Sequence, residues 1–152
     1  GHSLGALMAY AASIELCKKG IIPEAIVVSG NPGPGVRSKR RLHNLEDKPF
    51  KDEVFKLGGI PSEIIDHDEM MSFFLPILRA DFKLAEELDE HYQEALNVPI
   101  YALMGTHEEH VQDIANWKQY TNRGFHSEVL EGNHFFVNDH PERIAKAIEF
   151  VL

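Results

Sequence analysis

Residues 1–5 read Gly-His-Ser-Leu-Gly, a G-x-S-x-G pentapeptide, and an apolar, alanine-rich run over residues 6–12 follows it directly. This arrangement is typical of a sharp turn between a strand and a helix, in which a strained backbone lifts the serine Oγ clear of the sheet. The two glycines would let strand and helix approach closely, where side chains would collide. The alternative interpretation is a glycine-flanked helix start with Ser3 as its N-cap.

The composition limits the classes of protein to which the chain can belong. Its 152 residues are 43% hydrophobic and 26% charged, which is ordinary for one globular domain. The formal net charge of −9 argues against a general nucleic-acid binder, and no apolar run approaches the length of a membrane span. The single cysteine, Cys17, excludes an intramolecular disulfide and fits a reducing compartment, so we expect a cytoplasmic location.

Apolar residues alternate between helical spacing and short β-branched runs along most of the chain. The predicted helices cover residues 3–19, about 109–120, and from Pro141 onward, and the predicted strands cover residues 25–28, 99–104 and about 127–130. This alternation predicts an α/β fold with a mostly parallel sheet flanked by helices.

The stretch between residues 50 and 95 differs from this pattern because it is apolar without strand alternation. It predicts short helices divided by residues 58–61 and by Pro76, followed by an acidic amphipathic helix over residues 84–96. We interpret residues 45–97, approximately, as a helical lid inserted over a pocket. The alternative is that these helices belong to the core.

A serine nucleophile needs a base within hydrogen-bond reach and an acid that orients the base. In α/β-hydrolases the acid and then the histidine follow the serine along the chain. His134 follows the last predicted strand and a glycine-containing turn, which fits the base, although it could be a structural loop histidine. Residues 105–111 contain no aspartate, so Glu108 is the best-placed acid and Glu109 the second.

Two further features of the sequence bear on the site. The backbone N–H of Leu4, the residue after the serine, is the expected oxyanion donor. Residues 107–110 read His-Glu-Glu-His, but they lack H-E-x-x-H spacing, so we expect no metal and no other cofactor. The basic cluster over residues 37–41 is either a solvated loop or a contact for a phosphate or an acidic partner.

Several longer stretches of the chain resemble the type II thioesterases that accompany nonribosomal peptide and polyketide synthetases. Leu-Gly-Gly-Ile-Pro at residues 57–61 and Leu-Pro-Ile-Leu-Arg-Ala-Asp-Phe at residues 75–82 are similar to the lid signatures of that family. Gly-Asn-His-Phe-Phe at residues 132–136 resembles its histidine motif, and Gly30 and Trp117 also fall at family positions. The resemblance covers nearly the whole chain. The sequence departs from the family at the acid loop, where it has His107-Glu108 and the family has an aspartate.

The resemblance implies an α/β-hydrolase that cleaves acyl or aminoacyl thioesters from the phosphopantetheine arm of acyl or peptidyl carrier proteins and so clears stalled or misprimed synthetases. In that interpretation Ser3 is the nucleophile, His134 the base and Glu108 the acid. The family also has an upstream half with the first strands and an oxyanion loop. We therefore expect residues 1–152 to be the C-terminal portion of such a domain. The alternatives are a general esterase or lipase on free acyl substrates and a catalytically silent hydrolase fragment.

Overall fold

Parallel strands form the centre of the described part of the chain, in the order β1 (Ile26–Ser29), β2 (Ile100–Gly105) and β3 (Phe125–Leu130). The computed structural model describes residues 1–36, 41–57, 60, 64, 67–92 and 94–151. The crossovers between the strands contain helices, as parallel pairing requires. The order and direction of the strands confirm the predicted α/β-hydrolase type of sheet.

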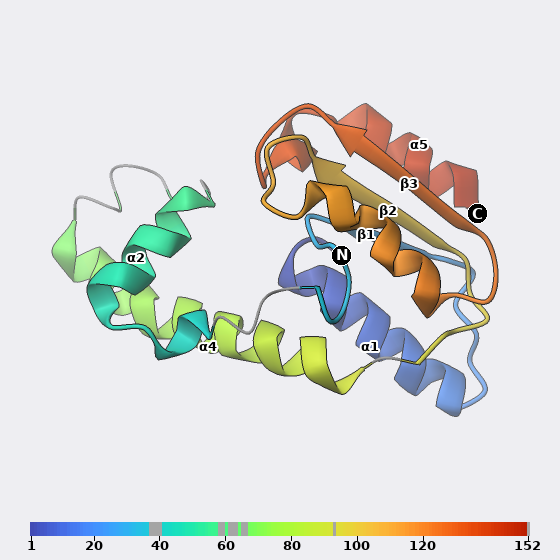
Figure 1. The fold of residues 1–152 in the computed structure, drawn as a ribbon, viewed down its shortest axis with the longest axis horizontal. Helices are drawn as coiled ribbons and strands as arrows, with labels where there is room; N and C mark the ends of the chain where they lie inside the picture. The colour runs from blue at the N-terminus through green and yellow to red at the C-terminus, as the bar shows by residue number, and fades with distance from the viewer. Residues whose placement is uncertain (37–40, 58–59, 61–63, 65–66, 93, 152) are drawn as a thin grey trace.

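Helices cover both faces of this sheet (Figure 1). Helix α1 (Leu4–Lys18) and the 3-10 helix η2 (Val111–Tyr120) pack on one face, and α5 (Pro141–Val151) packs on the other. Alternate residues of β2 pack against the helices on the two faces of the sheet, because successive strand side chains point to opposite faces. Ile100, Ala102 and Met104 belong to the cluster with α1, whereas Tyr101 and Leu103 belong to the cluster with α5.

The residues before α1 continue the sheet alongside β1. The Ser29 N–H donates to the Gly1 carbonyl at 2.9 Å, and the Ser3 N–H donates to the Ser29 carbonyl at 2.8 Å. His2 and Ser29 accordingly form a parallel bridge. Residues 1–2 therefore form a short extended segment beside β1, and the chain turns at Ser3 into α1. This is the strand–turn–helix arrangement expected from the pentapeptide.

The 3-10 helix η1 (Leu42–Asn44) and helices α2 (Asp47–Lys56) and α4 (Asp68–His91) form a second group of elements beside the sheet (Figure 1). Phe50, Val54, Met71 and Leu75 make a small buried cluster of their own there. The prediction that this stretch is helical is confirmed, whereas its role as a lid stays a prediction. Residues 37–40 of the basic cluster, and residues 58–59 and 61 of the first resembling stretch, lie outside the described residues.

Pro76 lies inside α4, so the prediction that it divides two short helices was wrong. A proline in a helix interior removes one backbone hydrogen bond and costs about 3 kcal/mol. Burial of Met71 and Leu75, which lie just before Pro76 in α4, offsets that cost. The helix also ends at His91 rather than at Leu96, which forms an isolated parallel bridge with Thr121.

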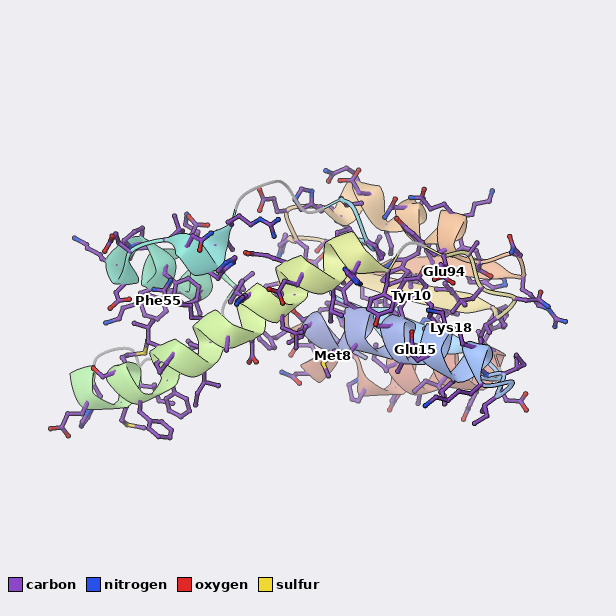
Figure 2. All side chains as sticks on the ribbon, turned by 90° about the horizontal axis from the view of Figure 1, so that it is seen from below. Met8, Tyr10, Glu15, Lys18, Phe55 and Glu94 are labelled. Carbon is purple, nitrogen blue, oxygen red and sulfur yellow. The ribbon has the colours of Figure 1, made fainter. Side chains whose placement is uncertain are left out.

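The C-terminal part of α4 and the residues after it run beside α1 (Figure 2). The Tyr10 hydroxyl donates to the Glu94 carbonyl, and burial raises the pKa of Tyr10 far above its usual range, so the hydroxyl keeps its proton. Lys18 Nζ lies 3.5 Å from Glu94 Oε1 on the surface. These contacts hold the residues that follow α4 against α1. No helix of the described segments has the length and apolar character needed to cross a membrane.

Candidate active site

Ser3 occupies the strained conformation expected at the turn between strand and helix. Its φ of 56° is positive, and within the described residues no other non-glycine residue has a positive φ. Ser3 holds the N-cap position of α1, as the alternative interpretation expected, but its side chain makes no capping hydrogen bond to the helix. A Cβ at Gly1 would lie 1.9 Å from the Gly5 carbonyl oxygen, whereas a Cβ at Gly5 would meet nothing within 4 Å. The predicted collision therefore holds for the first glycine alone.

His134 connects Ser3 to Glu108 through two hydrogen bonds. Its Nδ1 lies 2.7 Å from Glu108 Oε2, and its Nε2 lies 2.9 Å from Ser3 Oγ. An ionised carboxylate can only accept, so Nδ1 carries the ring proton and Nε2 is left to accept from the Ser3 hydroxyl. Both the imidazole and the carboxylate are buried. The three side chains thus form one directed chain of hydrogen bonds.

Glu108 is itself held in place by the backbone at the end of β2. The Gly105 N–H donates to Glu108 Oε1 at 2.8 Å, while Oε2 accepts from His134. A Cβ at Gly105 would lie 2.4 Å from the Asn133 carbonyl, so the strand end can lie against the histidine loop only with glycine there. Glu109 is exposed. The structure therefore brings the first of the two candidate carboxylates, and not the second, to the imidazole.

Both histidines of the His-Glu-Glu-His segment over residues 107–110 lie near carboxylates other than Glu108. His107 Nε2 lies 3.4 Å from Glu131 Oε1, and His110 Nδ1 lies 3.3 Å from Asp113 Oδ2. Within the described residues no three histidine, cysteine, aspartate or glutamate side chains gather in a way that could hold a metal ion.

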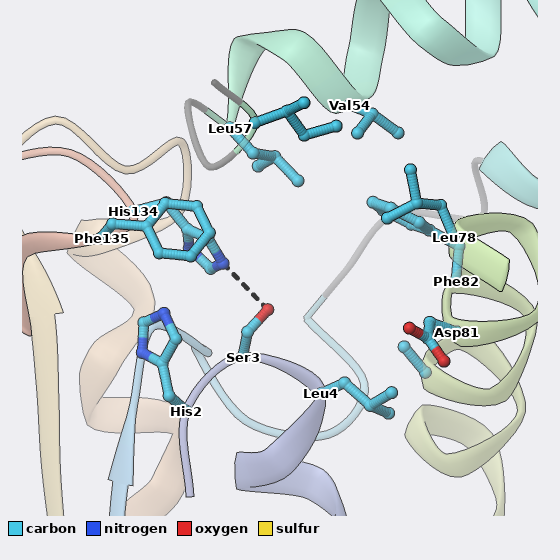
Figure 3. Close-up of a pocket in the computed structure, with 12 residues that line it drawn as sticks. His2, Ser3, Leu4, Val54, Leu57, Leu78, Asp81, Phe82, His134 and Phe135 are labelled. Atoms are coloured by element: carbon cyan, nitrogen blue, oxygen red, sulfur yellow. Dashed lines mark hydrogen bonds between the residues drawn. The ribbon is translucent and has the colours of Figure 1, made fainter. Parts of the chain in front are cut away.

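Ser3 opens into a cavity of about 290 Å³ between α1 and the helices α2 and α4 (Figure 3). The wall away from Ser3 is mostly apolar and comes from Val54, Leu57, Ile60, Leu78, Phe82 and Ala85. His2, His134 and Phe135 line the end beside the serine, and Leu4 borders it. The backbone N–H of Leu4 donates to no acceptor within the described part of the chain, so it is available at the cavity beside Ser3 Oγ.

A family model described as Thioesterase domain matches residues 1–151. The chain belongs to the thioesterase domain family. Thioesterase PikA5 of Streptomyces venezuelae is 33% identical over 151 residues, which are 97% of this chain and 54% of that protein. The probable anguibactin biosynthesis thioesterase AngT of Vibrio anguillarum is 30% identical and is matched over 97% of this chain and 61% of its own length. The chain therefore spans between about half and two thirds of the length of these relatives.

Solved structures with the same fold also carry thioesterase names. RedJ, a thioesterase from the prodiginine biosynthetic pathway of Streptomyces coelicolor, superimposes with a TM-score of 0.84 at 30% identity, covering 99% of this chain and 61% of that one. YbtT, a type II thioesterase from the yersiniabactin NRPS/PKS pathway, gives a TM-score of 0.84 at 31% identity over 97% of this chain and 61% of its own. The predicted resemblance to type II thioesterases is confirmed by these comparisons.

A buried loop after β1 supports the serine of this thioesterase domain from below. Asn31 Nδ2 donates to the Ser3 carbonyl at 3.3 Å, and the indole of the fully buried Trp117 donates to the Asn31 carbonyl at 2.8 Å. Trp117 was singled out from the sequence only through the family resemblance. Its hydrogen bond gives a physical reason for a tryptophan there, because it ties η2 to the loop beneath Ser3.

His2 and Gly30 lie against the imidazole and were not predicted from placement in the sequence. The His2 and His134 ring centroids are 4.9 Å apart, and His2 Nδ1 lies 3.0 Å from Ser29 Oγ. Gly30 has a φ of 62°, and a Cβ there would lie 2.4 Å from His2 Cε1 and 3.1 Å from His134 Cε1. His2 is the first variable position of the G-x-S-x-G pentapeptide, so the motif alone gives no information on its contacts.

Proposed function

We propose that the protein is a serine hydrolase that cleaves acyl or aminoacyl thioesters from the phosphopantetheine arm of acyl or peptidyl carrier proteins. The observation that carries the proposal is the hydrogen-bonded chain from Glu108 through His134 to Ser3, with Ser3 facing an apolar cavity. The family and the pathway names of the relatives support the thioester and the carrier.

The geometry supports a two-step acyl transfer. Ser3 Oγ attacks the thioester carbonyl carbon while His134 Nε2 accepts the serine proton. Glu108 holds the ring with Nδ1 protonated and stabilises the imidazolium that forms. The tetrahedral intermediate then expels the pantetheine thiolate, which takes the proton from His134, and leaves an acyl ester on Ser3. Water gives a proton to His134 and attacks this ester, and the carboxylic acid leaves as the proton returns to Ser3 Oγ.

Two features of the local backbone lower the energy of the oxyanion. Ser3 stands at the N-terminus of the 15-residue helix α1, where the positive end of the helix dipole and free N–H groups lie. The Leu4 N–H is the oxyanion donor that this chain supplies, and loss of one such donor typically costs about 100-fold or more in rate.

The apolar wall of the cavity suits an acyl chain. Burying each methylene contributes about 0.8 kcal/mol, so the aliphatic and aromatic lining favours acyl groups over water. The helices α2 and α4 that supply most of this wall would then act as the lid predicted from the sequence. A soluble carrier substrate is also the reason to propose a cytoplasmic location.

The proposal is tested by turnover of a matched set of substrates that carry the same acyl group. We expect the protein to hydrolyse acyl-phosphopantetheinyl carrier proteins with a higher kcat/KM than the corresponding acyl-CoA or p-nitrophenyl esters, and Ser3→Ala to abolish all three activities. Ser127→Ala is a matched control, because this serine is exposed on β3, does not line the cavity and has no hydrogen bond to Ser3, His134 or Glu108.

The outcomes separate the alternatives. Equal kcat/KM values for all three substrates would contradict carrier-directed hydrolysis and would favour a general esterase. Absence of Ser3-dependent turnover of any substrate would favour a catalytically silent hydrolase fold.

A further inference from the structure

Asp81 is a charged side chain in the otherwise apolar helical wall of the cavity. It projects from α4 toward the space above Leu4 and faces Ser3 across the cavity (Figure 3). Of the residues that line this cavity, the ones with ionisable side chains are Asp81, His2 and His134. Asp81 therefore stands apart from the two histidines, on the side where an acyl group would lie.

The neighbours of Asp81 along α4 provide no positive charge. Side chains three and four positions away share its helix face, and Ile77, Leu78, Leu84 and Ala85 occupy those positions. Arg79 and Lys83 are two positions away and so point elsewhere.

Both of these cations already have acceptors. Arg79 donates to the carbonyls of His43 and Leu45 and to Asp47, and Lys83 pairs with Glu87 at 3.8 Å. Asp81 has no hydrogen bond or ion pair with any described residue. Among the described residues, the cavity thus presents a carboxylate with no lysine or arginine paired to it.

We propose that Asp81 selects substrates whose acyl group carries an ammonium group, so that aminoacyl thioesters are preferred over uncharged acyl groups of the same shape. This inference rests on the proposed function and deepens it. The ammonium would lie between Asp81 and the scissile carbonyl at Ser3, while the rest of the acyl group contacts Leu78 and Phe82.

The expected preference is modest because Asp81 is exposed to solvent through the open cavity. Two opposite charges about 5 Å apart in an environment close to water attract enough to change a rate constant about four-fold. A protonated His134 would also be stabilised by Asp81, but that effect is shared by all acyl groups and cancels in a ratio of substrates.

The test measures kcat/KM for two pairs of pantetheine thioesters: alanyl against isobutyryl, and 6-aminohexanoyl against heptanoyl. Each pair differs by an ammonium in place of a methyl group, so the ratio within a pair reports the charge alone. In the Asp81→Asn protein we expect the amine-to-hydrocarbon ratio to fall about four-fold in at least one pair. Glu87→Gln, an exposed carboxylate on α4 outside the cavity, should leave both ratios unchanged.

Unchanged ratios in Asp81→Asn, with turnover intact, would overturn this inference and leave the proposed hydrolysis standing. Absence of Ser3-dependent turnover for all four thioesters would instead overturn the proposed function. Equal losses for both members of each pair would assign Asp81 to the support of His134 or of the fold, and would also overturn the selection of amines.

Discussion

Replacement of Gly30 by alanine tests whether the position of the imidazole depends on the backbone beneath it. A Cβ at this position would approach His134 Cε1 to 3.1 Å and His2 Cε1 to 2.4 Å. The His2 ring cannot swing away freely, because its Nδ1 is near Ser29 Oγ and Phe135 and Phe136 pack against it. The added methyl group must therefore push one or both imidazole rings.

The chain offers a matched control for the backbone strain. Gly20 has a φ of 78°, similar to the 62° of Gly30, but a Cβ at Gly20 would meet nothing within 4 Å. Alanine at either position pays the cost of the left-handed conformation, about 1–2 kcal/mol. Only Gly30→Ala adds a collision, which falls on His2 and on His134, the ring that would accept the Ser3 proton in the proposed mechanism.

We expect Gly30→Ala to lose more Tm than Gly20→Ala, because it adds the collision to the same backbone cost. We also expect the folded Gly30→Ala protein alone to lose at least about ten-fold in kcat, since a displacement of about 1 Å in a reacting group can cost about 100-fold. Thermal unfolding followed by circular dichroism gives the first quantity, and single-substrate thioester hydrolysis gives the second. A folded Gly30→Ala protein whose kcat stays within two-fold of Gly20→Ala would refute the reasoning that Gly30 fixes His134.

Three further substitutions test other parts of the account. Glu108→Gln should lower kcat about 1,000-fold or more, because an amide no longer stabilises the imidazolium, while Glu109→Gln stays within about two-fold in the same hydrolysis assay. Trp117→Phe should destabilise the protein by about 1–3 kcal/mol in urea unfolding, because it leaves a cavity and an unpaired Asn31 carbonyl in the loop beneath Ser3. The hydrogen bond from Arg143 lowers the pKa of Glu128 in the folded protein. The ionised Glu128 therefore stabilises the fold fully above its unfolded pKa of about 4.3. This contribution is lost as the pH falls through the lower pKa of the folded state. Glu128→Gln should therefore cost under about 1 kcal/mol at pH 7, with the difference from the unsubstituted protein vanishing near pH 2 in equilibrium unfolding.

The fold and the hydrogen-bonded set of Ser3, His134 and Glu108 could be predicted from the sequence because each leaves a local signal. Continuous β-branched runs such as Ile26-Val27-Val28 mark buried parallel strands, and the loops that follow the later strands hold Glu108 and His134. The position of a residue relative to a strand end then limits which edge of the sheet it can reach. That rule was enough to select His134 among the histidines.

Features that depend on tertiary contacts could not be predicted in the same way. Pro76 favours a helix break by local preference, and its place inside α4 depends on burial of its neighbours against α2. Position in the sequence favoured Glu108 over Glu109, but the Gly105 N–H that holds Glu108 Oε1 could not be predicted, because its direction is set by the folded end of β2. Asp81 is one polar residue on an amphipathic helix until α2 and α1 enclose the cavity around it.

The central claim is that Ser3 is a nucleophile activated by His134, and covalent labelling with a fluorophosphonate tests it most directly. The account predicts one adduct per chain, assigned to Ser3 by peptide mass spectrometry, absent in Ser3→Ala and slowed strongly in His134→Ala. A folded protein that takes up no label at Ser3, or that labels equally fast without His134, would contradict it.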